Sequence, residues 1–334
     1  MIKLVFFLLL SVFTAVCCFG QTVSNVDAYQ EGKNIIITYD TDKAGSVGDV
    51  YCSTDGGNTW SNPLRRVTGD VNKLVPAGSH RIVWDVLSER EKLAGANICF
   101  KVEANSGRFS VNGVSFEMVR VEGGTFRMGA TSEQEDEADG DEKLVHSVTL
   151  SSYYIGKTEV TQALWQAVMG SNPSHFKGAD LPVEFVTWNE CQEFIQKLNR
   201  LTGSNFRLPT EAEWEFACRG GNNSCGYKYS GSNNLGSVAW YDGNSGNQTH
   251  PVATKVPNEL GIYDMSGNVW EWCSDCFGDY TSYSQTNPTG PQSGLCHVDR
   301  GGSWYGSARH CRSSDRGEDA PTDPDNGLGL RLAL

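Results

Sequence analysis

Positive charge, clustered histidine and long apolar runs are all scarce in this sequence. Its 27 Lys and Arg residues are outnumbered by 40 Asp and Glu residues, which gives a formal net charge of −13. An acidic chain is repelled by nucleic acid and by anionic membrane surfaces, so we expect neither as a partner. The six histidines show no spacing typical of a zinc site or a catalytic triad.

The apolar run at residues 4–13 follows Lys3 and is too short to span a membrane. Small residues around Gly20 precede a plausible cleavage point before Gln21, so residues 1–20 are predicted to be a signal peptide. Val16 stands before Cys17, where a lipoprotein signal needs a small residue. We therefore expect an exported protein, periplasmic, cell-surface or secreted, without a membrane span.

Cysteine, in contrast, is plentiful. Of eleven cysteines, Cys17 and Cys18 fall in the predicted leader, which leaves nine. In an oxidising compartment most of these can form disulfides, and their connectivity is open. Cys273 and Cys276 form a single Cys-x-x-Cys pair, which is weak evidence for redox chemistry or zinc. Disulfides to other cysteines fit equally well, namely to Cys191, Cys225 or Cys296.

Residues 21–110 predict a β-sandwich of the immunoglobulin or fibronectin type. Short β-rich runs at 34–39, 50–53, 81–84 and 98–102 are separated by Gly- and Asn-bearing turns. Cys52 and Cys99 lie in two of these runs and are candidates for a disulfide. Residues 53–60 (Ser-Thr-Asp-Gly-Gly-Asn-Thr-Trp) resemble a single Asp-box, which predicts a stable hairpin turn.

Residues 113–334 predict a second domain with few helices and long loops, so the whole chain is expected to be α+β. Residues 116–129 are expected to open this domain as a strand pair, and the acidic run 133–142 to form a solvated loop. Capping signals at Thr161, Thr187 and Thr210 predict three helix starts, the last two with Glu three residues on.

Four motifs in this region resemble the formylglycine-generating enzyme (sulfatase-modifying factor) family. They are residues 207–215 (Arg-Leu-Pro-Thr-Glu-Ala-Glu-Trp-Glu), 267–272 (Gly-Asn-Val-Trp-Glu-Trp), 300–304 (Arg-Gly-Gly-Ser-Trp) and 328–334. The resemblance covers residues 113–334 and implies a C-type-lectin-like fold.

The enzymes of that family oxidise a substrate cysteine with a copper ion held by two cysteines that follow the Gly-Gly-Ser motif. Here only Cys311 is present: counted forward from the Gly-Gly-Ser motif, Gly306 stands at the first position and Cys311 at the second, whereas counted backward from residues 329–331, Cys311 matches neither. Two thiolates are needed to hold Cu(I), so copper and catalysis are not expected, and Cys311 is only a weak catalytic candidate. The resemblance instead implies a Cys218–Cys311 disulfide.

The resemblance also implies a Ca²⁺ site. By position, its ligands are the side chains of Asp264 and Glu271 and the carbonyls of Gly267 and Val269. Oxygen ligands of this kind suit calcium. A purely structural turn is the alternative.

In the C-terminal segment, residues that look fixed alternate with residues that look variable; we call the first the frame (301–304, 308–309, 311–314, 316, 320–322 and 328–331) and the second the gaps. This layout resembles the variable proteins of diversity-generating retroelements. The gap residues are the candidate ligand-binding set: Tyr305, Gly306, Ser307, His310, Asp315, Gly317, Glu318, Asp319, Asp323, Asp325, Asn326 and Gly327. Because this set is acidic, we expect a cationic ligand or one bridged by a metal. We expect Trp304 and the frame arginines to be buried and to hold the backbone.

The first hypothesis is an exported, non-catalytic protein that binds a protein or carbohydrate ligand through residues 305–327. One alternative is a formylglycine-generating oxidoreductase that acts on sulfatase cysteines. Another is a structural component of a cell-surface assembly.

Overall fold

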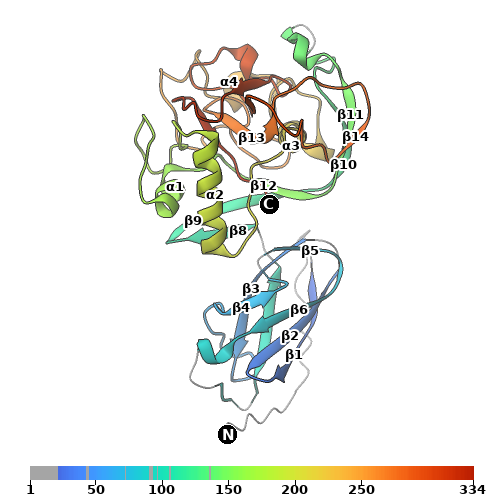
Figure 1. The fold of residues 1–334 in the computed structure, drawn as a ribbon, viewed down its shortest axis with the longest axis vertical. Coiled ribbons are helices and arrows are strands. Elements are labelled where there is room, and N and C mark those ends of the chain that lie inside the picture. The colour runs from blue at the N-terminus through green and yellow to red at the C-terminus, as the bar shows by residue number, and fades with distance from the viewer. Residues whose placement is uncertain are drawn as a thin grey trace. The chain divides into compact units, whose positions relative to one another are not determined.

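The computed structural model describes residues 22–42, 45–71, 73–89, 93–95, 97–104, 107–134 and 137–334. The predicted signal peptide lies outside the described residues. The chain divides into two compact units, and the division falls between residues 106 and 107 (Figure 1). Within the described residues, no helix is long and apolar enough to cross a membrane.

The first unit consists of two antiparallel sheets that share one core. One sheet has the order β1 (Val23–Glu31), β2 (Asn34–Thr41), β6 (Gly78–Trp84) and β4 (Val67–Gly69). The other has the order β5 (Lys73–Val75), β3 (Gly45–Ser53) and β7 (Cys99–Ala104). Ile35, Ile37 and Trp84 of the first sheet pack in one cluster with Val50 and Val102 of the second.

Cys52 and Cys99 do not form the disulfide considered from the sequence. In the β3–β7 register, Cys52 pairs with Phe100 and Ser53 pairs with Cys99. Side chains alternate between the two faces of a strand, so the two thiols point to opposite faces of this sheet. Nearby, the Asp-box turn is held as predicted: Ser53 Oγ donates to Asp55 Oδ1 at 2.7 Å, and Thr59 N donates to the same oxygen at 2.9 Å.

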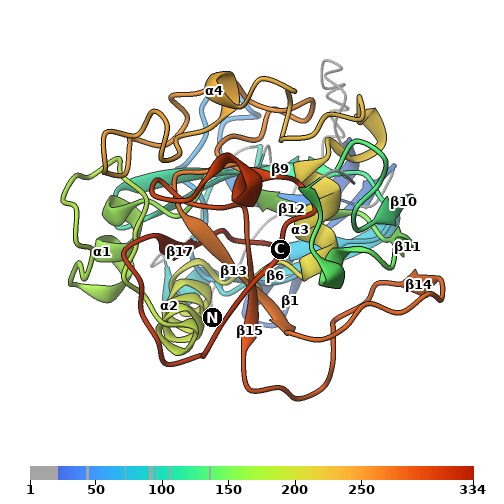
Figure 2. The ribbon, with the colours of Figure 1, turned by 90° about the horizontal axis from the view of Figure 1, so that it is seen from above.

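The second unit contains three small sheets. The first has the strand order β12 (Tyr153–Gly156), β9 (Val114–Val121) and β8 (Arg108–Val111). The second has the order β10 (Gly124–Met128), β11 (His146–Leu150) and β14 (Gln285–Thr286). The third has the order β16 (Gly317–Asp319), β15 (His297–Arg300), β13 (Trp270–Cys276) and β17 (Leu328–Leu330). Residues 116–129 do contain two strands, but β9 and β10 belong to different sheets and do not pair. Long loops connect many of these elements (Figure 2).

The three predicted helix starts are confirmed. They begin α1 (Gln162–Met169), α2 (Trp188–Thr202) and α3 (Glu211–Cys218), and a short α4 (Leu235–Val238) follows. Each capping threonine accepts a hydrogen bond from the backbone three residues on, and α2 and α3 carry full capping boxes. Gly203 ends α2 with φ +71°, a conformation that glycine adopts without strain.

Strand β17 and the residues after it lie inside the second unit. β17 pairs in parallel with β13, and Leu330 and Leu332 belong to the core cluster that covers α2. Tyr154 N donates to Leu334 O at 3.0 Å, and Ala333 exchanges backbone hydrogen bonds with Arg207. The C-terminal segment is therefore fixed at both of its ends, by β15 before it and β17 after it.

Candidate functional site

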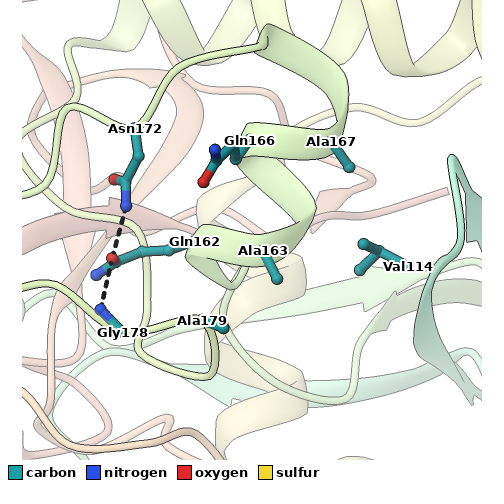
Figure 3. A pocket seen from close by; sticks show the side chains of 8 residues that line it. All are labelled: Val114, Gln162, Ala163, Gln166, Ala167, Asn172, Gly178 and Ala179. Atoms are coloured by element: carbon teal, nitrogen blue, oxygen red, sulfur yellow. Dashed lines mark hydrogen bonds between the residues drawn. The ribbon is translucent and has the colours of Figure 1, made fainter.

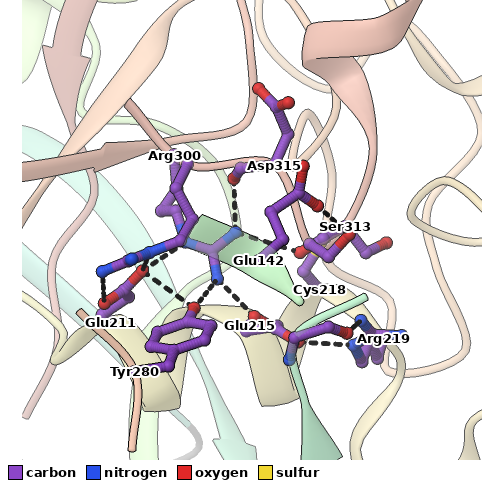
Figure 4. A network of polar contacts seen from close by, with 12 residues as sticks. Glu142, Glu211, Glu215, Cys218, Arg219, Tyr280, Arg300, Ser313 and Asp315 are labelled. Atoms are coloured by element: carbon purple, nitrogen blue, oxygen red, sulfur yellow. Dashed lines mark hydrogen bonds and ion pairs between the residues drawn. The ribbon is translucent and has the colours of Figure 1, made fainter. Parts of the chain in front are cut away.

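Three fully buried arginines anchor the C-terminal segment: Arg300, Arg312 and Arg331. Arg300 ends β15 and pairs with Glu211 and Glu215 of α3 (Figure 4). Its guanidinium also donates to the carbonyl oxygens of Ser313 and Asp315. Hydrogen bonds to two carbonyls of the segment fix its backbone as well as satisfying the charge.

The prediction that residues 133–142 form a solvated loop holds for Glu137, Asp139 and Gly140, which are exposed, but not for Glu142, which Arg312 binds. Glu142 from that run is 1% exposed, and both of its oxygens accept from Arg312, at 2.8 and 2.7 Å. Arg312 also donates to Asp315 Oδ1 at 2.7 Å. Asp139, Glu142 and Asp315 bring three carboxylate oxygens within 4.8 Å of one another, but Arg312 already bridges two of these groups. The cluster is therefore an ion-pair network.

Arg331 holds Glu271, one of the predicted calcium ligands. Its Nε and Nη2 donate to the two oxygens of Glu271 at 2.8 and 2.6 Å, and Trp214 Nε1 donates to Glu271 Oε2 at 2.7 Å. Both oxygens of this carboxylate are thus already engaged. As arranged here, Glu271 does not fit the role of an ion ligand.

The remaining groups at this turn do fit a cation. Asp264 is buried with φ +59°, and burial raises its pKa to about 6. A third buried carboxylate, Glu159, was not anticipated from the sequence. It accepts from Asn268 Nδ2 at 2.7 Å and Val269 N at 3.1 Å, and burial with the charges of Asp264 and Glu271 raises its pKa. Three buried carboxyl groups thus share one arginine, so Glu159 and Asp264 take up protons more readily than exposed acids do, and a cation bound beside Asp264 would favour their ionised forms instead.

The predicted ligand-binding residues differ in exposure. Tyr305, Ser307, Glu318 and Asp323 are exposed, whereas Gly306, Asp315 and Gly327 are buried. The others are half-buried, namely His310, Gly317, Asp319, Asp325 and Asn326. Trp304 is half-buried, so its predicted burial is only partial.

Several of these residues are brought together. Asp325 Oδ1 accepts from Tyr305 Oη and from Gly327 N, each at 2.7 Å, and Trp304 Nε1 donates to Asn326 O at 3.0 Å. Asp319 is half-buried, and burial followed by the charges of Asp325, Asp323 and Glu318 raises its pKa. Residues 305 and 318–327 thus form one acidic surface, whereas Asp315 points inward to Arg312.

No disulfide joins the cysteines that the structure describes, so the Cys218–Cys311 bond implied by the resemblance is absent. Cys218 Sγ contacts Met265 O at 3.6 Å, and Cys311 Sγ contacts Ser307 O at 3.9 Å. The two thiols also belong to different hydrophobic clusters. Cys311 is fully buried, which raises its pKa and disfavours the thiolate.

Two cavities lie elsewhere in this unit. One, of about 460 Å³, is lined by α1 and the loop after it; Gln162 Oε1 there accepts from Asn172 Nδ2 at 2.8 Å and Gly178 N at 3.1 Å (Figure 3). The other, of about 300 Å³, lies beside Glu159 and Tyr263. Neither of these two cavities is lined by residues 305–327.

Comparison with known proteins agrees with this geometry. Residues 106–334 match the family model described as sulfatase-modifying factor enzyme 1-like domain. A chaperone protein, LppX, of Paenibacillus barcinonensis is 36% identical over 297 residues, 73% of this chain and 97% of that protein. The formylglycine-generating enzyme of Mus musculus is 32% identical over 263 residues, 69% of this chain and 68% of that enzyme.

Solved structures show the same fold. Variable protein 1 of Treponema denticola superposes with a TM-score of 0.62 at 36% identity, covering 68% of this chain and 98% of that one. PvdO of Pseudomonas aeruginosa superposes with a TM-score of 0.58 at 26% identity, covering 69% of this chain and 99% of that one. The chain therefore belongs to the sulfatase-modifying factor family and carries its C-type-lectin-like fold.

Proposed function

We propose that this protein is an exported, non-catalytic binding protein whose ligand surface lies within residues 305–327. The observation that carries the proposal is the separation of roles along the C-terminal segment. Arg300 and the frame residues Arg312 and Arg331 are buried in ion pairs, whereas Tyr305, Ser307, Glu318 and Asp323 between them are exposed. Exposed side chains on a rigidly held backbone suit recognition, because they can change without disturbing the core.

The cysteine chemistry favours binding over oxidation. A copper-dependent oxidase of this family needs two thiolates at the motif. Gly306 occupies one of those positions, and Cys311 is buried among apolar residues such as Leu235 and Val238. Burial raises the pKa of Cys311, which opposes the thiolate that Cu(I) requires.

Titration with Cu(I) distinguishes a binding protein from a copper-dependent oxidase. We expect the mature protein to show no tight dithiolate Cu(I) site and no oxidation of a sulfatase-type cysteine peptide. The Mus musculus enzyme serves as the positive control. Stoichiometric Cu(I) binding with turnover would replace the binding proposal with the oxidoreductase.

We further propose that residues 305–327 are diversified. The likeness to the T. denticola variable protein and the exposure of Tyr305, Ser307, Glu318 and Asp323 within the segment support this. The test is to read the DNA downstream of the gene. A near-copy of the segment that differs almost only at adenines, beside a reverse transcriptase gene, is expected; without one, a fixed ligand replaces the diversified one.

Two features complete the proposal. The paired sheets of the first unit support an immunoglobulin- or fibronectin-like sandwich that acts as a spacer or docking module. The burial of Asp264 and Glu159 beside a single arginine, Arg331, supports Ca²⁺ beside Asp264, with the carbonyls of Gly267 and Val269 as further ligands. Such an ion would stabilise the turn that precedes β13.

A further inference from the structure

A buried carboxylate without a hydrogen-bond partner lies beneath the acidic surface. Asp299, on β15, is 3% exposed, and its Oδ2 accepts no hydrogen bond among the described residues. Burial, and then the charges of Asp319 and Asp315, raise its pKa well above the usual range. An unpartnered buried carboxylate is costly, which points to a group that the free protein does not supply.

The sheet register places this carboxylate directly under the surface strand. Asp299 pairs with Gly317 of β16 on one side and with Trp272 of β13 on the other. A Cβ on Gly317 would lie 2.0 Å from Asp299 Oδ1, so the absence of a side chain makes room for the carboxylate. Gly317 itself is half-buried, so little more than its backbone separates Asp299 from the surface.

The same face of the sheet carries a second carboxylate and an aromatic wall. Asp319 pairs with His297, so its side chain leaves the sheet on the side of Asp299. Trp188 of α2 stacks on His297, with ring centroids 3.9 Å apart. Burial lowers the pKa of His297, which keeps this ring neutral rather than a partner for the acids.

The described residues supply no cation for this face. Their ion pairs include none with Asp299 or Asp319, and none with Asp323 and Asp325 farther along the segment or with Glu318 on the opposite face of β16. The buried carboxylates Glu142, Glu211 and Glu271, in contrast, are each paired with a buried arginine. Once ionised, Asp299 and Asp319 therefore have no ion-pair partner among the described residues, although the charge of Arg300 lowers the pKa of Asp299 in part.

The spacing of the acids favours an organic cation over a metal ion. Among the described residues, the group of three acidic side chains close enough to share a metal does not include Asp299 or Asp319. Diagonal neighbours across a strand pair are about 7–8 Å apart, a span that several N–H donors on one group can bridge. A guanidinium or ammonium also binds favourably against indole and imidazole rings, unlike a hydrated metal ion.

We propose that the ligand of this surface is a protein with a basic side chain whose cationic head lies against Gly317 and Asp319 and offsets the charge of Asp299 beneath them. This inference rests on the proposed binding function and specifies its ligand. The Trp188–His297 stack forms one wall of the subsite, and Glu318 and Asp323 supply the surrounding negative field.

The test uses the full mature protein and small probes. N-acetyl-arginine amide and N-acetyl-lysine amide are titrated by NMR, with N-acetyl-citrulline amide as the neutral analogue of the arginine probe. We expect at least one cationic probe to bind with a Kd of about 1 mM and citrulline to bind at least tenfold more weakly. Equal binding of citrulline, or no binding of either cation, would overturn the inference.

Variants locate the subsite. Asp299→Asn keeps the shape of the side chain and is expected to weaken the cationic probe about tenfold or more. Asp319→Asn is also expected to weaken binding of the cationic probe. If Asp299→Asn fails to fold, the affinity of Asp319→Asn for the probe tests the subsite. Asp180→Asn removes an exposed acid outside the segment and is expected to leave binding unchanged. Wild-type affinity in Asp299→Asn, or displacement of the probe by equimolar Ca²⁺, would overturn the subsite.

A further variant separates this inference from the binding function. The N-acetyl-arginine amide probe is titrated against Tyr305→Ala as well as Asp299→Asn. Loss in Tyr305→Ala alone would uphold the binding surface and reject the cationic subsite. Loss in neither variant would reject both.

Discussion

Arg312 shows how a single buried side chain holds the C-terminal segment to residues far away in the sequence. It binds both oxygens of Glu142 and one of Asp315 while it is itself fully buried. Removing one partner of a buried ion pair leaves an uncompensated charge, which costs more than the pair contributes.

We predict that Arg312→Ala lowers the free energy of unfolding by about 3–5 kcal/mol. Arg309→Ala is the matched control, because Arg309 is exposed and pairs with the exposed Asp139. Its loss is expected to be at most about 1 kcal/mol. Urea unfolding of both variants measures the difference; similar small losses would mean that the buried network does not hold the segment.

The buried carboxyl group of Asp275 should make the free energy of unfolding depend on pH. Burial, and then the charge of Glu211, raise its pKa to about 7 in the folded protein, from 3.8. Between about pH 4 and pH 7 the folded state therefore keeps a proton that the unfolded state releases, so this residue's contribution falls as pH rises through that window. The free-energy difference between wild type and Asp275→Asn should decline from pH 4 to 7 and level off on both sides. A flat difference would contradict the assignment.

At the scale of elements, features set by neighbouring residues could be predicted from the sequence, whereas contacts between residues far apart in the chain could not. The starts of α1, α2 and α3 were readable because each capping threonine lies three residues before the backbone N–H that donates to it. The partners of Arg312 and Arg331 were not, because Glu142 and Glu271 lie 170 and 60 residues away. Asp299 gave no signal at all, since its position under Gly317 depends on the β15–β16 register.

The turn before β13 distinguishes its two acidic residues. We predict that Asp264→Ala lowers the Tm in Ca²⁺ but not in chelator, because its role is to hold the ion. Glu271→Ala should lower the Tm in both conditions, because it leaves the buried Arg331 without its partner. Calorimetry with and without chelator checks both; an equal loss for Asp264→Ala in the two conditions would assign a structural turn.

At the scale of the whole molecule, each unit has its own core. The cluster around Trp84 contains only residues of the first unit, and the clusters around Phe194 and Trp214 only residues of the second. Motif resemblance predicted the family and the lectin-like fold, because residues of the motifs, such as Trp214, Trp272 and Arg331, are buried in the second unit. The ligand is not encoded in that frame, so the resemblance could not specify it.

We predict that thermal unfolding of the mature protein resolves into two transitions. Residues 107–334 produced alone should keep one of them, with the same Tm within a few degrees. The first unit produced alone should keep the other. A single transition that disappears on separating the units would show that neither core is sufficient.

The backbone pairing of residues 332–334 with Tyr154, Gly156 and Arg207 also sets an order of events during synthesis. β13 has no β17 beside it, and Glu271 has no arginine, until residue 331 has left the ribosome. The second unit must then wait, with its central sheet and a buried carboxylate open, for contacts that span more than a hundred residues. Exchanging the side chains of residues 305–327 thus alters a stretch that emerges just before the core closes.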